Sequence, residues 1–238
     1  MSRLRWLFGS LATMLGLTWA TPQPGFLNSL EGPYDDEPLT VATWSYAVTR
    51  LECIEAKTGR LLGWGSGVWL EWRPSVNPEI ISAAHVYEEC PSGDLYSPEY
   101  DTHFSLVAVD TDKDLVVLRA DDRVTPALKL RVDPSGKYPR VGSLVWIVGF
   151  PGPMETTRAV TQGIVEAIKY TIDAYAKAGP RPLLVTDGMV YFGNSGGGFL
   201  NEKGEIIGIA HAIMTSGGYH AALATPAPDI LDFLNSIR

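Results

Sequence analysis

Short apolar stretches alternate with turn-forming residues along most of the chain. Each stretch is rich in Val, Ile, Leu, Trp and Thr, and most are followed by clusters of Gly, Pro, Asn, Asp or Lys. The stretches cover residues 46–54, 61–72, 104–109, 115–120, 144–150, 161–167, 183–190, 198–200 and 205–213. Many short strands at hairpin spacing are typical of a sandwich or barrel. The pattern therefore predicts an all-β protein.

Helical spacing of apolar residues occurs convincingly only at the C-terminal end. Thr225 can cap a helix, and Pro226 fits its first turn. One face then carries Ile230, Leu231, Phe233, Leu234 and Ile237. A polar, turn-rich stretch over residues 133–140 interrupts the strand pattern. We therefore predict two β units of similar size, divided near residues 133–140, and a helix over 226–237.

The N-terminal forty residues have a different character. Arg3 and Arg5 precede an uncharged stretch, 6–20, that ends in small residues. This is the layout of a secretory signal peptide, which we predict over residues 1–20. Fifteen residues are fewer than the roughly twenty that cross a bilayer, so we expect no stable membrane span. We expect a secreted or periplasmic protein; the alternative is a membrane anchor over 6–20. Residues 21–40, with four prolines and four acidic residues, predict a linker or pro-segment.

Composition narrows the function. The chain has 238 residues, of which 45% are apolar and 19% charged, as in a globular domain. Its net charge of −8 argues against a nucleic-acid binder, which needs a basic face. Cys53 and Cys90 are the two cysteines, and in an oxidising compartment they either pair or remain separate buried thiols. With no Cys-x-x-Cys or His-x-x-x-His spacing, we expect neither a metal nor a cofactor.

The most unusual stretch is residues 191–198, where four glycines surround Asn-Ser. A serine becomes a nucleophile when a base takes its proton and oriented donors stabilise the oxyanion. A sharp turn can bring the N–H groups of Gly193 and Ser195 together as those donors. The glycines that follow would leave room for a substrate backbone. A glycine-rich hairpin turn is the alternative interpretation of the same residues.

A serine nucleophile also needs a histidine and a carboxylate. His85 ends an apolar stretch among small residues that let an imidazole face a cleft. Asp114 heads an apolar run, so it is half-buried and needs a partner. His103 and His220 lie in polar or glycine-rich segments and are expected at the surface or weakly held. His211 falls inside a predicted strand, as a core or cleft-wall residue.

Three motifs, in the order SAAHV (82–86), DLVVL (114–118) and GNSGG (193–197), resemble those of trypsin-like serine proteases, most closely the HtrA/Deg branch. The similarity extends over residues 45–237. It implies a protease domain at 41–238, built from six-stranded antiparallel β-barrels at about 43–132 and 141–222 and the C-terminal helix. By this resemblance His85 is the general base, Asp114 orients it, and Ser195 is the nucleophile. The Gly193 and Ser195 amides bind the oxyanion, in a cleft between the barrels.

The resemblance also implies finer features. It joins Cys53 to Cys90, tying the first strands to the chain after His85. It places the substrate pocket at Met189, Val190, Phe192, His211, Ala212 and Ile213. Met189 stands where trypsin itself has an acidic residue, and a Lys or Arg side chain would be buried there without a partner. We therefore expect an endopeptidase that cleaves proteins or peptides after small or medium apolar residues. The oligomeric state and the role of loop 170–182 do not follow from the sequence.

Two other functions compete with this one. Gly193-x-Ser195-x-Gly197 also matches the nucleophile turn of α/β-hydrolases. That family has its acid before its histidine, whereas here His220 precedes Asp229, so we disfavour it. The other alternative is a catalytically inactive trypsin-fold homologue that acts as a protein-binding module. It loses ground because all three triad residue types are present.

Overall fold

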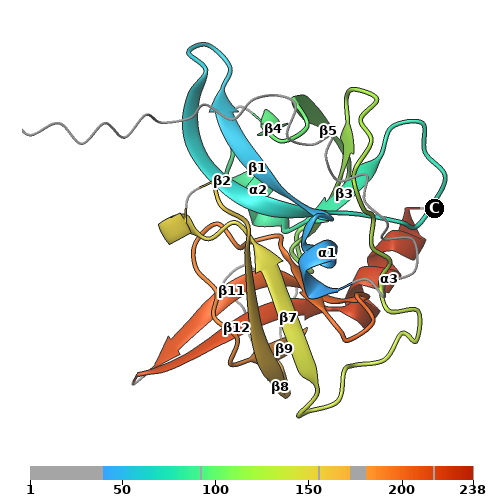
Figure 1. Ribbon diagram of the computed structural model, residues 1–238, viewed down its shortest axis with the longest axis vertical. Helices are drawn as coiled ribbons and strands as arrows, with labels where there is room; N and C mark the ends of the chain where they lie inside the picture. Colours follow the sequence, from blue (N-terminus) through green and yellow to red (C-terminus); the bar gives the residue numbers. More distant parts are fainter. Residues whose placement is uncertain (1–39, 92, 155, 172–180, 217, 238) are drawn as a thin grey trace, which may run out of the picture. The chain divides into compact units, whose positions relative to one another are not determined.

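The computed structural model describes residues 40–237 except 92, 155, 172–180 and 217 (Figure 1). The predicted signal peptide, the segment 21–39 and most of loop 170–182 lie outside the described residues. No helix within the described ranges is both long and apolar enough to cross a bilayer.

The first half of the described chain closes into a six-stranded barrel, with strand order β1-β2-β3-β6-β5-β4 and antiparallel neighbours (Figure 1). The short helix α1 (Val41–Ser45) precedes the first strand of this barrel, and the short helix α2 (Ala84–Glu88) follows its third strand. Its strands are β1 (Val48–Glu55), β2 (Arg60–Trp69), β3 (Glu79–Ser82), β4 (Leu95–Ser97), β5 (Thr102–Asp110) and β6 (Leu115–Ala120).

The second half repeats this architecture in the order β10-β11-β12-β9-β8-β7. Its strands are β7 (Leu144–Gly149), β8 (Ala159–Thr171), β9 (Arg181–Thr186), β10 (Gly198–Leu200), β11 (Ile206–Ser216) and β12 (Tyr219–Pro226). A 3-10 turn, η2 (Gly152–Met154), follows β7, and helix α3 (Ala227–Ser236) ends the chain. Two closed barrels and a C-terminal helix confirm the predicted fold class.

Helix α3 begins differently from the prediction. Its N-cap is Pro226, and no side chain caps the helix. Thr225 is instead a fully buried strand residue that pairs with Ile209 of β11. Its hydroxyl donates to the Lys113 carbonyl, 2.8 Å away in the first barrel. Thr225 therefore belongs to strand β12 and, contrary to the prediction from the local sequence pattern, does not cap helix α3.

The apolar core joins the barrels rather than separating them. Each barrel has its own interior cluster, around Trp69 in the first and Phe199 in the second. A third cluster runs through the seam and takes residues from both barrels and from α3, including Val68, Ile209 and Phe233. Burying one continuous apolar surface favours a fixed docking of the two barrels. Side chains contributed by either barrel to the seam are thereby held in register.

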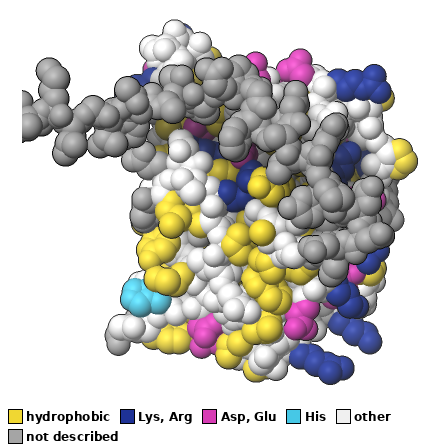
Figure 2. Space-filling model, in the orientation of Figure 1, with side chains coloured by type: hydrophobic (Ala, Val, Ile, Leu, Met, Phe, Trp, Pro, Cys, Tyr) yellow, Lys and Arg dark blue, Asp and Glu magenta, His cyan; other side chains and the backbone are white. Residues whose placement is uncertain are grey.

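The charged residues are not segregated on the face shown in Figure 2. Acidic and basic side chains are interspersed there, with hydrophobic side chains between them.

Candidate active site

His85 and Asp114 meet because the strands that carry them are paired. In the antiparallel pair β3–β6, Ser82 lies opposite Val116. The end of β3 therefore lies beside the start of β6. His85 comes shortly after β3, and Asp114 immediately precedes β6. His85 Nδ1 donates to Asp114 Oδ2 at 2.8 Å, and the His85 backbone N–H donates to Oδ1 at 2.8 Å. One residue thus holds both carboxylate oxygens.

The same carboxylate has a second imidazole partner, which the sequence did not indicate. His211, on β11 of the second barrel, donates from Nδ1 to Asp114 Oδ2. The side chains are almost fully enclosed, with 1% of His211 and 3% of Asp114 exposed. Burial would raise the pKa of the carboxyl, but the hydrogen bonds from His211 and His85 hold that pKa below its ordinary value of 3.8.

Ser195 lies where two tight turns meet. Residues 191–194 form the first turn and 194–197 the second, each closed from its last N–H to its first carbonyl, at 3.0 and 2.8 Å. The third position of each turn is a glycine with positive φ, 93° at Gly193 and 82° at Gly196. A positive φ at this position is the mark of a type II turn and strongly favours glycine.

The backbone bonds around these turns fix where two amides point. Gly152 N–H donates to the Phe192 carbonyl at 2.6 Å, and the second turn occupies the Asn194 carbonyl. In a trans peptide the N–H points opposite to the carbonyl of the same unit. The Gly193 and Ser195 amides therefore point away from these partners, and neither has a hydrogen-bond acceptor among the described residues. They are available to a ligand atom.

The glycines after the serine make room for the protein itself. A Cβ on Gly196 would lie 2.1 Å from both the Ser66 carbonyl oxygen and Ser82 Oγ, and one on Gly197 would lie 2.3 Å from the Val148 carbonyl oxygen. We expected these glycines to admit a substrate backbone. In the structure the turn around Ser195 also packs against the first barrel and β7, which leaves no space for a side chain at either glycine.

Ser66 supports the turn and was missed as a functional residue. Its buried hydroxyl donates to the Gly193 carbonyl at 2.7 Å and accepts from Phe150 N–H at 3.0 Å. Its own N–H donates to the Ser195 carbonyl at 2.8 Å. In the sequence Ser66 stands in a short glycine-containing segment, GSGV (65–68), which carries no information about these distant partners.

A cleft of about 700 Å³ opens beside the serine. Eight predicted site residues line it: His85, Val190, Phe192, Gly193, Ser195, His211, Ala212 and Ile213. Met189 is not in the lining; it is 60% exposed, and its carbonyl accepts the Thr161 hydroxyl at 2.8 Å. Phe192 lies at the rim and is almost fully exposed.

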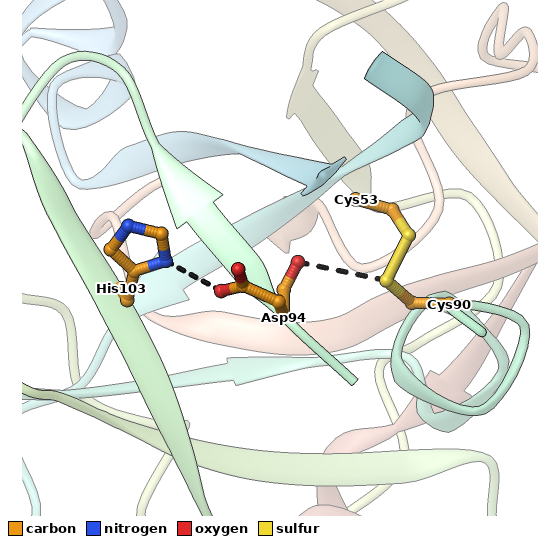
Figure 3. The surroundings of a disulfide bond; sticks show 4 residues. All are labelled: Cys53, Cys90, Asp94 and His103. Carbon is orange, nitrogen blue, oxygen red and sulfur yellow. Dashed lines mark hydrogen bonds and ion pairs between the residues drawn. A yellow bond between two sulfur atoms is a disulfide. The ribbon is translucent and has the colours of Figure 1, made fainter. Parts of the chain in front are cut away.

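A disulfide fixes the segment that follows His85. Cys53 on β1 is bonded to Cys90, just beyond α2, with the Cα atoms 5.5 Å apart (Figure 3). The pairing is the one that the family resemblance implied. Beside it, half-exposed His103 pairs with Asp94 at 2.5 Å, so His103 is a surface residue as expected (Figure 3). The bond anchors the His85 helix to the first barrel.

His85, Asp114 and His211 are also residue types that bind metals, and their ligand atoms lie within 4.8 Å of one another. Ligands of a tetrahedral zinc ion at ~2.0 Å are about 3.3 Å apart. His85 Nδ1 and Asp114 Oδ2 are 2.8 Å apart, which is a hydrogen-bond distance. Hydrogen bonds therefore account for the spacing of these side chains, and the spacing does not match that of zinc ligands.

Two closed six-stranded barrels with a Ser, a His and an Asp near their junction are the arrangement of trypsin-like peptidases, and comparison with known proteins gives the same class. The family model of the trypsin-like peptidase domain matches residues 65–209, so the chain belongs to that family. The Do-like serine protease HtrA of Bacillus subtilis is 37% identical over 62% of this chain and 33% of its own length. A probable periplasmic DegP-like serine endoprotease of Halomonas elongata is 36% identical over 56% of this chain and 27% of its own length.

A solved HtrA-type protease, AlgW with a tripeptide, shares the fold. The TM-score is 0.65 at 24% sequence identity, over 81% of this chain and 60% of that one. The matches thus place this chain beside HtrA-type protease domains. Aligned segments span about a quarter to a third of the curated relatives' length.

Proposed function

We propose that this protein is a serine endopeptidase that cleaves peptide bonds through an acyl-enzyme. The observation that carries the proposal is that Ser195 and His85 line the same cleft, and that the His85 ring is hydrogen-bonded to Asp114. Because Nδ1 donates to the carboxylate, the lone pair of the neutral His85 ring is at Nε2. That nitrogen takes the hydroxyl proton of Ser195 as its Oγ attacks the scissile carbonyl.

The developing oxyanion is received by the Gly193 and Ser195 amides. Both lie in the cleft lining, and the turn geometry holds both away from other acceptors. Collapse of the tetrahedral intermediate expels the amine, which His85 protonates, and leaves an ester on Ser195. Water activated by the same imidazole then hydrolyses the ester and restores the serine.

The cleft favours small or medium apolar side chains at the P1 position. Among the described residues, the second-barrel side of the cleft has no acidic side chain; it includes Val190, Ala212, Ile213, Thr215 and Leu223, and its polar members Asn194 and His211 carry no negative charge. Glu89 is the one acidic residue among the described lining residues, and it belongs to the first barrel. A Lys or Arg side chain buried against the second barrel would lose its hydration without gaining a carboxylate partner, which is unfavourable.

Substrates in this proposal are proteins or peptides outside the cytoplasm. Two of the relatives named above are serine proteases, and one of these is described as periplasmic. The predicted signal peptide at residues 1–20 supports the same destination for this chain. Export would also supply the oxidising conditions in which the Cys53–Cys90 bond forms.

Ser195→Ala tests the proposal directly. The purified variant should fold, lose labelling by a fluorophosphonate probe and turn over peptides about 10⁶-fold more slowly. Ser75→Ala, at an exposed loop residue, is the matched control and should label and cleave like the parent protein. Peptidase activity retained in the Ser195→Ala protein would refute the assignment.

A further inference from the structure

The Asp114 carboxylate is hydrogen-bonded by residues of both barrels, His85 of the first and His211 of the second. Arg181 on β9 places Nη2 3.4 Å from His211 Nε2 and 3.5 Å from His211 Nδ1, and its Nη1 donates to the Thr225 hydroxyl at 3.1 Å. That hydroxyl donates in turn to the carbonyl of Lys113, the neighbour of Asp114. Two branches from one buried arginine therefore end on the Asp114 turn.

This turn needs support, because Asp114 has a φ of 52°. A non-glycine residue is uncommon in the left-handed region of the backbone, although Asp adopts it more readily than most. Conformations of this kind persist only where the surroundings hold them. The contacts from the second barrel reach both the backbone beside Asp114 and its side chain.

We propose that His211 is a positioning residue for the triad: by donating a hydrogen bond from Nδ1, it holds the Asp114 carboxylate in place for His85. Arg181 Nη2 is almost equally far from both His211 ring nitrogens, so the tautomer is set by the Asp114 carboxylate, which only accepts hydrogen bonds. The hydrogen of His211 is therefore at Nδ1, where it donates to Asp114. Asp114 therefore accepts from His211 of the second barrel and from His85 of the first.

This inference rests on the proposed peptidase activity and adds a consequence of its own. His211 and His85 donate to the same oxygen, so His211 withdraws part of the negative charge that would otherwise stabilise a protonated His85. Removing the His211 donor should make His85 accept a proton at higher pH. The catalytic base would then be neutral over a narrower pH range.

Charged groups of both barrels and of α3 lie near this cluster. The first barrel contributes Asp114 and Lys113, Asp110 pairs with Lys113, and Glu89 lies in the cleft lining. The second barrel contributes Arg181, and Asp229 of α3 interacts electrostatically with both Lys113 and Arg181. A substitution confined to His211 leaves all of these unchanged.

The test is a nitrogen-15 NMR titration of the His85 ring, with peptidase kinetics alongside. His211→Leu removes the donor and keeps an apolar side chain of moderate size. His211→Asn restores a donor, because the Asn amide nitrogen occupies nearly the place of Nδ1. His211→Leu should raise the His85 titration midpoint by about 0.5–1 pH unit and lower kcat about ten- to a hundredfold. His211→Asn should recover most of both.

The outcomes separate a positioning role from a structural one. A His85 midpoint unchanged in His211→Leu, or an Asn variant no better than Leu, would overturn the inference. If His211→Leu does not fold, His211→Gln takes its place, because its amide nitrogen matches Nε2 and leaves Asp114 without the donor. If the parent protein cleaves no peptide while the midpoint still shifts, the proposed function fails and the positioning geometry stands.

Discussion

Replacing Gly196 by alanine separates two reasons for a glycine beside the nucleophile. Gly196 has a φ of 82°, and its added Cβ would lie 2.1 Å from the Ser66 carbonyl oxygen and from Ser82 Oγ. Gly59 has a similar φ of 69°, but a Cβ there would meet nothing within 4 Å. Gly59→Ala therefore carries the conformational strain alone, and Gly196→Ala carries the strain and the clash.

The expected free energies of unfolding follow from these contacts. Left-handed strain costs roughly 1–2 kcal/mol at either position. Forcing extra volume into a packed site costs about 1–3 kcal/mol more. Gly196→Ala should therefore lose about 2–5 kcal/mol of stability in urea unfolding, and Gly59→Ala about 1–2 kcal/mol.

Activity should distinguish the variants more sharply than stability does. Relieving the Gly196 clash moves Ser66, whose N–H holds the Ser195 carbonyl and whose hydroxyl holds the Gly193 carbonyl. The rate of fluorophosphonate labelling, measured on folded protein, should drop at least tenfold in Gly196→Ala and stay at the parent value in Gly59→Ala. Equal stability losses together with parent-like labelling of Gly196→Ala would show that the turn does not pack against the first barrel as argued.

Two further predictions concern specificity and pH. Digestion of a peptide library should show cleavage after small or medium apolar residues such as Val, Ala or Leu, and preferred cleavage after Lys or Arg would contradict the pocket assignment. Asp114→Asn should destabilise the protein near neutral pH, because the lowered pKa of Asp114 means that the folded state favours the carboxylate. That stability is present above the ordinary value of 3.8 and is lost as pH falls through the lower folded value, so the melting-temperature gap between variant and parent should narrow below about pH 4. A gap that widens on acidification would show that the sign is wrong.

Sequence reasoning succeeded for elements whose signal is local. Most of the strands and the C-terminal helix follow from side-chain periodicity and turn residues. It missed α1, α2, β4 and β12, which are short or lie in segments with a weak apolar pattern. The order of the three motifs was enough to indicate the family, because each motif is a short run of adjacent residues.

The site shows where local signals end. Asp114 and His211 are separated by 97 positions, and only the docking of the two barrels brings them together. The same docking decides that Ser66 supports the nucleophile turn and that Thr225 serves the Asp114 turn rather than capping α3. Sequence alone determined most of the strands, the C-terminal helix and the residue types for the chemistry, since those depend on neighbours along the chain. Tertiary structure decided which buried donor meets which acceptor, because burying a charged carboxylate requires partners that only chain segments distant in sequence can supply.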